Sequence, residues 1–178
     1  MPDKSETRLI EAAIDGDIES FAKLCEQYYA VMVAIGYSVL GDHQLAEDAA
    51  QESFARALVS LRKLKHQTRF APWLAAICRN VAKDMVASKV RQISTKDLSK
   101  AARNNNHDES RRMIRRAIEQ LPASARELIV LRYYNNLSYE EISSVLGISK
   151  PAINGRLIRA KRKMANYLRR NGFPEDQL

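Results

Sequence analysis

Apolar residues recur every three to four positions along most of the chain, which places them on one face of an α-helix. No stretch alternates with period two between hairpin turns, so the pattern does not predict strands. Turn signals at Asp15-Gly16-Asp17, Gly41-Asp42 and Leu121-Pro122 separate the apolar stripes. The pattern therefore predicts an all-α protein with helices over 5–14, 18–40, 45–64, 70–90, 113–121 and 124–134.

Two further helices are predicted from local signals near the C-terminus. Ser138 and Glu141 have the spacing of a capping box, in which each side chain binds the other residue's backbone N–H. Gly147 supplies the permissive backbone that ends a short helix, and Ser149 caps the next. Pro151 lies in the first turn of that helix, where a missing N–H is tolerated. Two short helices joined by a glycine-containing turn predict a helix-turn-helix.

The second of these helices has one apolar and one basic face. Residues 150–170 contain eight Lys or Arg and no acidic residue. The apolar stripe consists of Ile153, Leu157, Ala160 and Met164, and the opposite side carries Pro151, Asn154, Gly155, Ile158, Arg159 and Arg162. Such a face combines cations that seek phosphates with side chains that reach base edges. It favours DNA binding over the alternative, a solvated basic face on a terminal helix.

The region between the two helical segments reads as a linker, because it has few large apolar residues. The sequence thus predicts two small helical domains joined by a flexible linker: an N-terminal domain over residues 1–91, a linker over 92–110, and a C-terminal domain with the helix-turn-helix over 111–173.

Charge is unevenly distributed along the 178 residues, although the net charge is +8. Residues 1–52 hold three basic and eleven acidic groups, residues 53–104 twelve and two, and residues 105–178 fourteen and eight. The basic segments favour a polyanionic partner, and the acidic one calls for a different partner.

Other classes of function have little support. Cys25 and Cys78 lie far apart and the three histidines are scattered, so we expect free buried thiols and no metal, cofactor or catalytic residues. No signal peptide is expected, and no apolar run approaches the roughly 20 residues of a membrane span. These features predict a cytoplasmic protein that is neither membrane-inserted nor an enzyme.

Two further stretches are candidates for function. In AEDAAQESFARAL, Asp48, Gln51 and Glu52 lie together opposite Phe54, as a binding face or as a merely solvated acidic face. Residues 61–84 mix six Lys or Arg with Phe70 and Trp73, and cations interleaved with aromatics suit single-stranded nucleic acid. The alternative is that Trp73 belongs to the core.

Three segments in this order resemble an extracytoplasmic-function (ECF) sigma factor, the bacterial RNA polymerase subunit that selects promoters. AEDAAQESFARAL resembles the polymerase-binding helix of that family, and RFAPWLAAICRNVAKD resembles its promoter-melting helix. The run from LPASAREL through LSYEEISSVLGIS to RLIRAKRKM resembles its helix-turn-helix domain. Together they span nearly the whole chain outside the tails and the linker.

The resemblance implies a role for each segment and a set of partners: core RNA polymerase, promoter DNA that is duplex at the −35 element and melted at the −10 element, and an anti-sigma factor. An obligate homo-oligomer is not implied. Polymerase docking would use Asp48, Gln51, Glu52 and Phe54. The −10 element would be contacted by Lys63, Lys65, Arg69, Arg79, Asn80 and Lys83. The −35 element would be read by Asn154, Ile158 and Arg159, with Lys150, Arg156 and Arg162 on phosphates.

The chain also departs from the family pattern. Lys150-Pro151-Ala152 replaces the usual Val-Gly-Thr at the start of the recognition helix, and Asn154-Gly155 stands where a Ser is common. Since Gly155 has no side chain, base readout should shift to Asn154, Ile158 and Arg159. The rival hypothesis is a free-standing helix-turn-helix regulator that binds an operator without polymerase.

Overall fold

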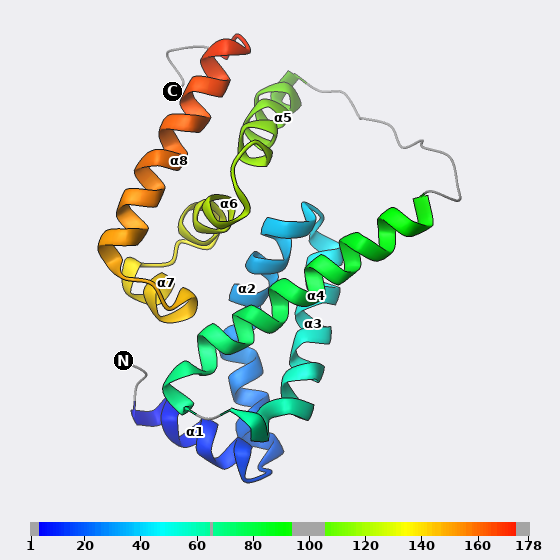
Figure 1. Cartoon of the computed structure of the whole chain (residues 1–178), viewed down its shortest axis with the longest axis vertical. Helices are drawn as coiled ribbons and strands as arrows, with labels where there is room; N and C mark the ends of the chain where they lie inside the picture. The colour runs from blue at the N-terminus through cyan, green and yellow to red at the C-terminus, as the bar shows by residue number, and fades with distance from the viewer. Residues whose placement is uncertain (1–3, 65, 94–105, 174–178) are drawn as a thin grey trace.

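The computed structural model describes residues 4–64, 66–93 and 106–173, and within these ranges the regular elements are all helical. An N-terminal unit comprises α1 to α4 and a C-terminal unit comprises α5 to α8. Figure 1 shows the long helix α4 crossing α2 and α3, while α8 runs beside α5 at the edge of the molecule. The predicted all-α fold with two helical domains is confirmed.

The N-terminal unit is a bundle whose helix ends follow the predicted turn signals. It contains α1 (Lys4–Ile14), α2 (Ile18–Leu40), α3 (His43–Ser60) and α4 (Phe70–Ile93), with single 3-10 turns η1 (Leu61–Lys63) and η2 (Gln67–Arg69) before α4. The carboxylate of Asp17 accepts from the N–H of Glu19 at 3.1 Å, and that of Asp42 accepts from Leu45 at 3.0 Å. These caps satisfy amides that the first turn leaves without a helical partner.

A close approach sets the position of α3 against α2. A β-carbon built on Gly36 would stand 3.1 Å from the carbonyl oxygen of Ala46. Ala46, Ala49 and Ala50 are fully buried on the facing side of α3. Small residues on both helices therefore let the backbones pack tightly, which turns the polar side of α3 outward.

The C-terminal unit contains α5 (Asn106–Glu119), α6 (Ala123–Ile129), the π-helical turn η3 (Val130–Tyr134), α7 (Tyr139–Leu146) and α8 (Lys150–Arg170). Both halves of the Ser138–Glu141 capping box are present, Gly147 ends α7 at φ +66°, and the Ser149 hydroxyl accepts from Ala152. The predicted helix-turn-helix is confirmed.

The helix expected over 124–134 is not regular to its end. The N–H of Asn135 donates to the carbonyl of Val130, five residues earlier, at 3.2 Å, which widens the last turn. Asn136 then adopts a left-handed conformation with φ +54°. Such π turns often occur at functional sites. Here the turn packs directly on α2.

The two units share one hydrophobic core cluster. It runs from Ile10, Leu24 and Leu74 in the first unit to Leu128 and Ile153 in the second, and all five side chains are fully buried. Contacts cross between α2 and both α6 and η3, and between α4 and α7. The domains predicted as tethered thus pack against each other.

Several predicted boundaries differ from the structure. The third helix ends at Ser60, and η1 carries on to Lys63, rather than one helix reaching 64. The helix α4 extends to Ile93 and α5 begins at Asn106, so both enter the predicted linker over 92–110. The remainder of that linker, 94–105, lies outside the described residues.

Candidate nucleic-acid and protein interfaces

The helix α8 presents its basic face outward because its opposite face is anchored in the core. Ile153, Leu157 and Ala160 are at most 3% exposed and pack with the rest of the core. The six residues predicted to contact the −35 element are all exposed: Lys150, Asn154, Arg156, Ile158, Arg159 and Arg162. Ile158 is 59% exposed, which is unusual for an isoleucine in a helix with a buried stripe.

Local contacts orient part of this α8 face. The hydroxyl of Tyr139 on α7 donates to the side-chain oxygen of Asn154 at 3.3 Å, leaving the amide NH2 as a donor. A β-carbon built on Gly155 would lie 3.5 Å from the guanidinium of Arg159, so this arginine lies over the glycine. Lys150 forms an ion pair with Glu140 of α7, and its hydrogen bond lowers the pKa of that carboxyl.

The residues predicted to contact the −10 element fall into two groups. Lys63, Arg69, Asn80 and Lys83 are exposed on η1, η2 and α4. Arg79 is half-buried, and its guanidinium is engaged by another side chain. Lys65 lies outside the described residues.

The aromatic residues of this region belong to the core rather than to a stacking surface. Phe70 is 1% exposed and lies edge-on to Tyr28, with ring centroids 5.6 Å apart. Trp73 is half-buried, and its ring centroid lies 5.9 Å from that of Phe70. Of the two readings of Trp73, the structure favours a place at the edge of the core. Phe70 contributes to the core and presents no exposed ring for base stacking.

The partner of Arg79 is Glu127 of α6, a residue that sequence reasoning missed. Arg79 Nε lies 2.8 Å from the Glu127 carboxylate, whose side chain is only 10% exposed. Burial raises the pKa of Glu127, while the charges of Arg79 and Lys83 act in the opposite direction. The signal in the sequence was that Glu127 directly precedes the apolar run from 128 to 131, and this position identified no partner.

The acidic residues of α3 and Phe54 lie on opposite sides of the helix, as the helical pattern predicts. Asp48, Gln51 and Glu52 are all exposed on α3. Phe54 is 9% exposed and packs in the core, so the structure does not bring it to this face. Leu58 is 43% exposed and Val59 is 87% exposed, whereas Ala57 and Leu61 on either side of them are buried, so both lie on the outward side of α3.

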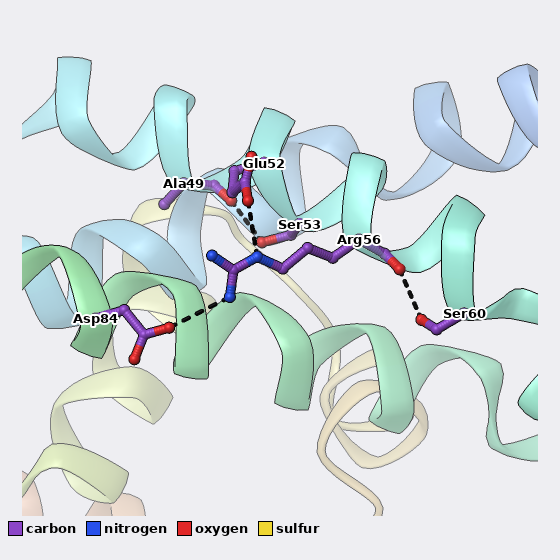
Figure 2. Close-up of polar contacts among 6 residues, drawn as sticks. All are labelled: Ala49, Glu52, Ser53, Arg56, Ser60 and Asp84. Carbon is purple, nitrogen blue, oxygen red and sulfur yellow. Dashed lines mark hydrogen bonds and ion pairs between the residues drawn. The ribbon is translucent and has the colours of Figure 1, made fainter.

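An arginine ties the acidic face to α4 (Figure 2). Arg56 Nε lies 2.7 Å from the carboxylate of Glu52, and its Nη1 lies 3.2 Å from that of Asp84. All three side chains are roughly half-exposed or more. Because such pairs stabilise little in water, we interpret this bridge as orienting Glu52.

Within the described residues, no cluster of His, Cys, Asp and Glu is arranged to hold a metal ion. Nor does any of their helices have the length and apolarity needed to cross a membrane. Cys78 is buried, its thiol donates to the carbonyl of Met32 at 3.3 Å, and burial raises its pKa. Cys25 is half-buried, and burial raises its pKa to about 11. Both therefore stay protonated thiols at neutral pH.

Comparisons with known proteins match both units. Residues 24–92 match the family model for sigma-70 region 2, and residues 111–164 match that for sigma-70 region 4. The chain is 30% identical over 179 residues to the probable RNA polymerase sigma factor RfaY of Xanthomonas campestris. It is 26% identical over 175 residues to the RNA polymerase sigma-H factor of Pseudomonas aeruginosa, and 28% identical over 134 residues to the ECF sigma factor SigM of Bacillus subtilis.

The shares covered differ among these relatives. The alignment with RfaY covers 89% of this chain and 45% of RfaY, so the chain spans about half the length of that protein. For sigma-H the shares are 89% and 91%, and for SigM they are 71% and 82%.

Solved structures share the fold. CnrH, solved in complex with the cytosolic domain of CnrY, aligns over 95% of this chain and 100% of its own with a TM-score of 0.62 at 21% identity. RpoE of Bartonella quintana, solved with the anti-sigma factor NepR, aligns over 85% of this chain and 98% of its own with a TM-score of 0.57 at 21% identity.

Both matched models describe parts of one class of protein, the sigma factors that associate with bacterial RNA polymerase, and the chain belongs to this sigma-70 family. Within the family, its relatives place it in the ECF group. The resemblance of the three sequence segments is thereby confirmed.

Proposed function

We propose that this sigma factor binds core RNA polymerase in the cytoplasm and directs it to promoters with −10 and −35 elements, without catalysing a reaction itself. The match of both region 2 and region 4 to the same chain supports this proposal. The proposed division is an N-terminal domain over 1–91 for polymerase and the −10 element, a linker over 92–110, and a C-terminal domain over 111–173 for the −35 element.

The observation that carries the proposal is the recognition helix α8, anchored on one side and open on the other. Lys150, Arg156 and Arg162 would contact phosphates, which position the helix without reading sequence. Asn154, Ile158 and Arg159 would face base edges in the major groove, where an amide, an apolar group and a guanidinium make distinct contacts. Since Arg159 lies over Gly155, that glycine makes room for the arginine rather than a base contact of its own.

For the −10 element we propose contacts from Lys63, Lys65, Arg69, Arg79, Asn80 and Lys83. The exposed cations would neutralise phosphates of an unpaired strand, and the exposed amide of Asn80 would bind a base. With Phe70 in the core, the aromatic side chains support this surface from beneath.

For polymerase docking we propose the exposed α3 face of Asp48, Gln51 and Glu52, with Phe54 holding the helix from the core side. Replacing both acids in Asp48→Lys/Glu52→Lys should abolish core binding while circular dichroism shows unchanged helix content. The matched control Glu11→Lys/Glu26→Lys makes the same charge change at exposed positions on α1 and α2. Unchanged core affinity of the first variant would remove α3 from the docking surface.

An anti-sigma factor is a further proposed partner. One solved structure with this fold is a complex with such a factor. Affinity capture with the intact chain as bait, followed by inhibition of transcription by the captured protein, tests this partner.

The direct test of the function is run-off transcription with purified core polymerase and a genomic promoter library, with and without this protein. We expect promoter-specific transcripts only when it is present. A free-standing regulator would instead protect a specific duplex in a footprint without polymerase. The region 2 match and the exposed acidic face disfavour that rival, since an operator-binding dimer needs neither.

A further inference from the structure

The two units meet along a seam that uses polar groups as well as apolar ones. The side-chain NH2 of Asn135, next to the π turn, donates to the carbonyl of Ala30 in α2 at 3.0 Å. The rings of Tyr37 and Tyr134 lie 6.3 Å apart across the same seam. At the other end, a β-carbon built on Gly147 after α7 would contact Pro72 of α4 at 3.6 Å. The seam therefore runs along both α2 and α4.

An ion pair between Arg79 and Glu127 also crosses this seam. The Glu127 carboxylate is almost fully covered, whereas the Arg79 side chain is 28% exposed. Removing one partner from such a pair leaves a buried charge without compensation, which is far costlier than losing an exposed pair. In the closed arrangement, in which the two units pack together as observed, Arg79 therefore compensates the buried charge of Glu127, and replacing either partner alone removes that compensation.

In the closed arrangement, cations that the proposed function assigns to two different DNA elements lie close to one another. Arg79 and Lys83 of α4 and Arg156 of α8 line one cavity of about 350 Å³, together with Glu127. Elements named for positions −10 and −35 lie about 25 base pairs apart, or roughly 85 Å at 3.4 Å per base pair. Side chains that line one cavity cannot contact both elements of a straight duplex at once.

We propose that the Arg79–Glu127 pair is an autoinhibitory latch: it holds region 4 against the DNA-facing side of α4 in the free protein and must open before the promoter is engaged. This inference rests on the proposed function in assigning Arg79 and Lys83 to DNA. The latch keeps a cation needed for the −10 strand paired within the chain. Glu127 thereby acts as an internal competitor for the phosphates that Arg79 would bind.

A charge-reversal cycle on the full chain tests the latch. Glu127→Arg faces Arg79 and Lys83 with a third cation, and Arg79→Glu faces Glu127 with a second carboxylate, so each single variant should open the molecule. The double variant Arg79→Glu/Glu127→Arg restores opposite charges and should close it again. Small-angle scattering of the free protein measures this as a rise in the radius of gyration for each single variant and a return to the wild-type value for the double variant.

The control Glu109→Arg makes the same charge change on exposed α5, away from the seam, and should leave the radius of gyration unchanged. Circular dichroism distinguishes separation of the two units from unfolding. If Glu127→Arg loses helix content, the radius of gyration of Arg79→Glu, whose substitution lies in the other unit, tests the latch instead. A double variant that stays as expanded as the single ones would overturn the latch.

The inhibitory consequence is measured with a mixed-sequence single-stranded DNA oligonucleotide. If the closed form makes up about nine-tenths of the free protein, opening by Glu127→Arg should raise the apparent affinity about tenfold beyond the gain of Glu109→Arg. An equal gain in both variants would reduce the pair to a structural contact and overturn autoinhibition. Failure of run-off transcription would overturn the proposed function but leave the scattering result intact.

Discussion

The helices α4 and α8 are both long and basic, yet their cations have different surroundings in the structure. On α8 the cations lie opposite the buried stripe of Ile153, Leu157 and Ala160, and the face stays open to a ligand. On α4 the cations lie at the boundary with another unit, so Arg79 is paired while Asn80 and Lys83 remain exposed. A basic helix is therefore available to nucleic acid only where the rest of the fold leaves its charged side uncovered.

The largest expected effect concerns the anchors of the two helices. Leu74→Ala in α4 and Leu157→Ala in α8 each remove a side chain that is at most 2% exposed, which should lower the free energy of unfolding by about 2–5 kcal/mol. Because one core cluster spans both units, Leu157→Ala should also shift the urea transition seen by fluorescence of Trp73, the single tryptophan in the other unit.

The control Leu157→Met conserves volume and should cost less than about 1.5 kcal/mol. A Trp73 transition that Leu157→Ala leaves unmoved would mean that the units unfold independently, and the contrast between the two helices would then lose its basis in a shared core.

The next effect compares Arg79, a cation that is paired with Glu127, with Arg159, an exposed cation of α8. Arg79→Ala leaves Glu127 buried without its partner and should lower the free energy of unfolding by about 1–3 kcal/mol. Arg159→Ala should change unfolding by less than about 0.5 kcal/mol. It should instead cost about 1–3 kcal/mol of DNA binding at one −35 position and relax selectivity there.

Urea denaturation and promoter-variant binding with the polymerase holoenzyme measure the two quantities. Equal loss on every promoter would reassign Arg159 to phosphate contact. Equal loss of stability in the two variants would contradict the distinction between the cations of α4 and α8.

A smaller effect concerns the caps that hold the open face of α8 in place. Ser138→Ala removes the capping box of α7 and should cost about 1 kcal/mol. Ser149→Ala removes a longer bond of 3.4 Å at the start of α8 and should cost less. Thermal unfolding of the two variants side by side measures the order, and a larger loss for Ser149→Ala would reverse it.

The smallest expected effect concerns how the free energy of unfolding depends on pH, which should differ between Glu127 in α6 and Glu141 in α7. The pKa of Glu127 is raised by burial above its ordinary value of 4.5, so the folded state holds this proton more tightly than the unfolded state. The stability from this carboxyl is full below pH 4.5 and is lost as the pH rises through the folded-state pKa. The pKa of Glu141 is lowered by hydrogen bonds from Ser138, so its contribution is lost as the pH falls.

Glu127→Gln should therefore remove a decline of stability above pH 4.5, whereas Glu141→Gln should remove a decline towards lower pH. Unfolding free energies measured from about pH 2.5 to 7 compare them. Identical pH profiles for wild type and Glu127→Gln would show that burial does not perturb this carboxyl.

Much of the fold was predictable because its signals are local. The helix over 18–40 was predicted with its observed bounds, since Asp17 and Gly41 mark its ends within one turn of backbone. The Ser138–Glu141 box and the Ser149 cap likewise involve residues three apart. The exposure of Asn154, Ile158, Arg159 and Arg162 followed from a single helical stripe.

Other features depended on which neighbour covers a helix. Leu58 follows the buried Phe54 by about one helical turn, yet it is 43% exposed because no other helix covers its side of α3. The π turn at Val130–Tyr134 lies where the chain packs on α2, and no residue pattern in the sequence predicted it. The segment 106–110 belongs to the predicted linker, yet it forms the start of α5, a helix that packs on α8.

By itself the sequence determined the helices, their caps, the helix-turn-helix and the outward faces of α3 and α8. These follow from interactions over three to eleven positions along one helix, where geometry is fixed by the helical repeat. Only the tertiary structure decided that Arg79 meets Glu127, 48 residues away on another helix, because the partner of a side chain depends on how whole helices pack. The same packing leaves the cations of α8 exposed and engages Arg79 of α4.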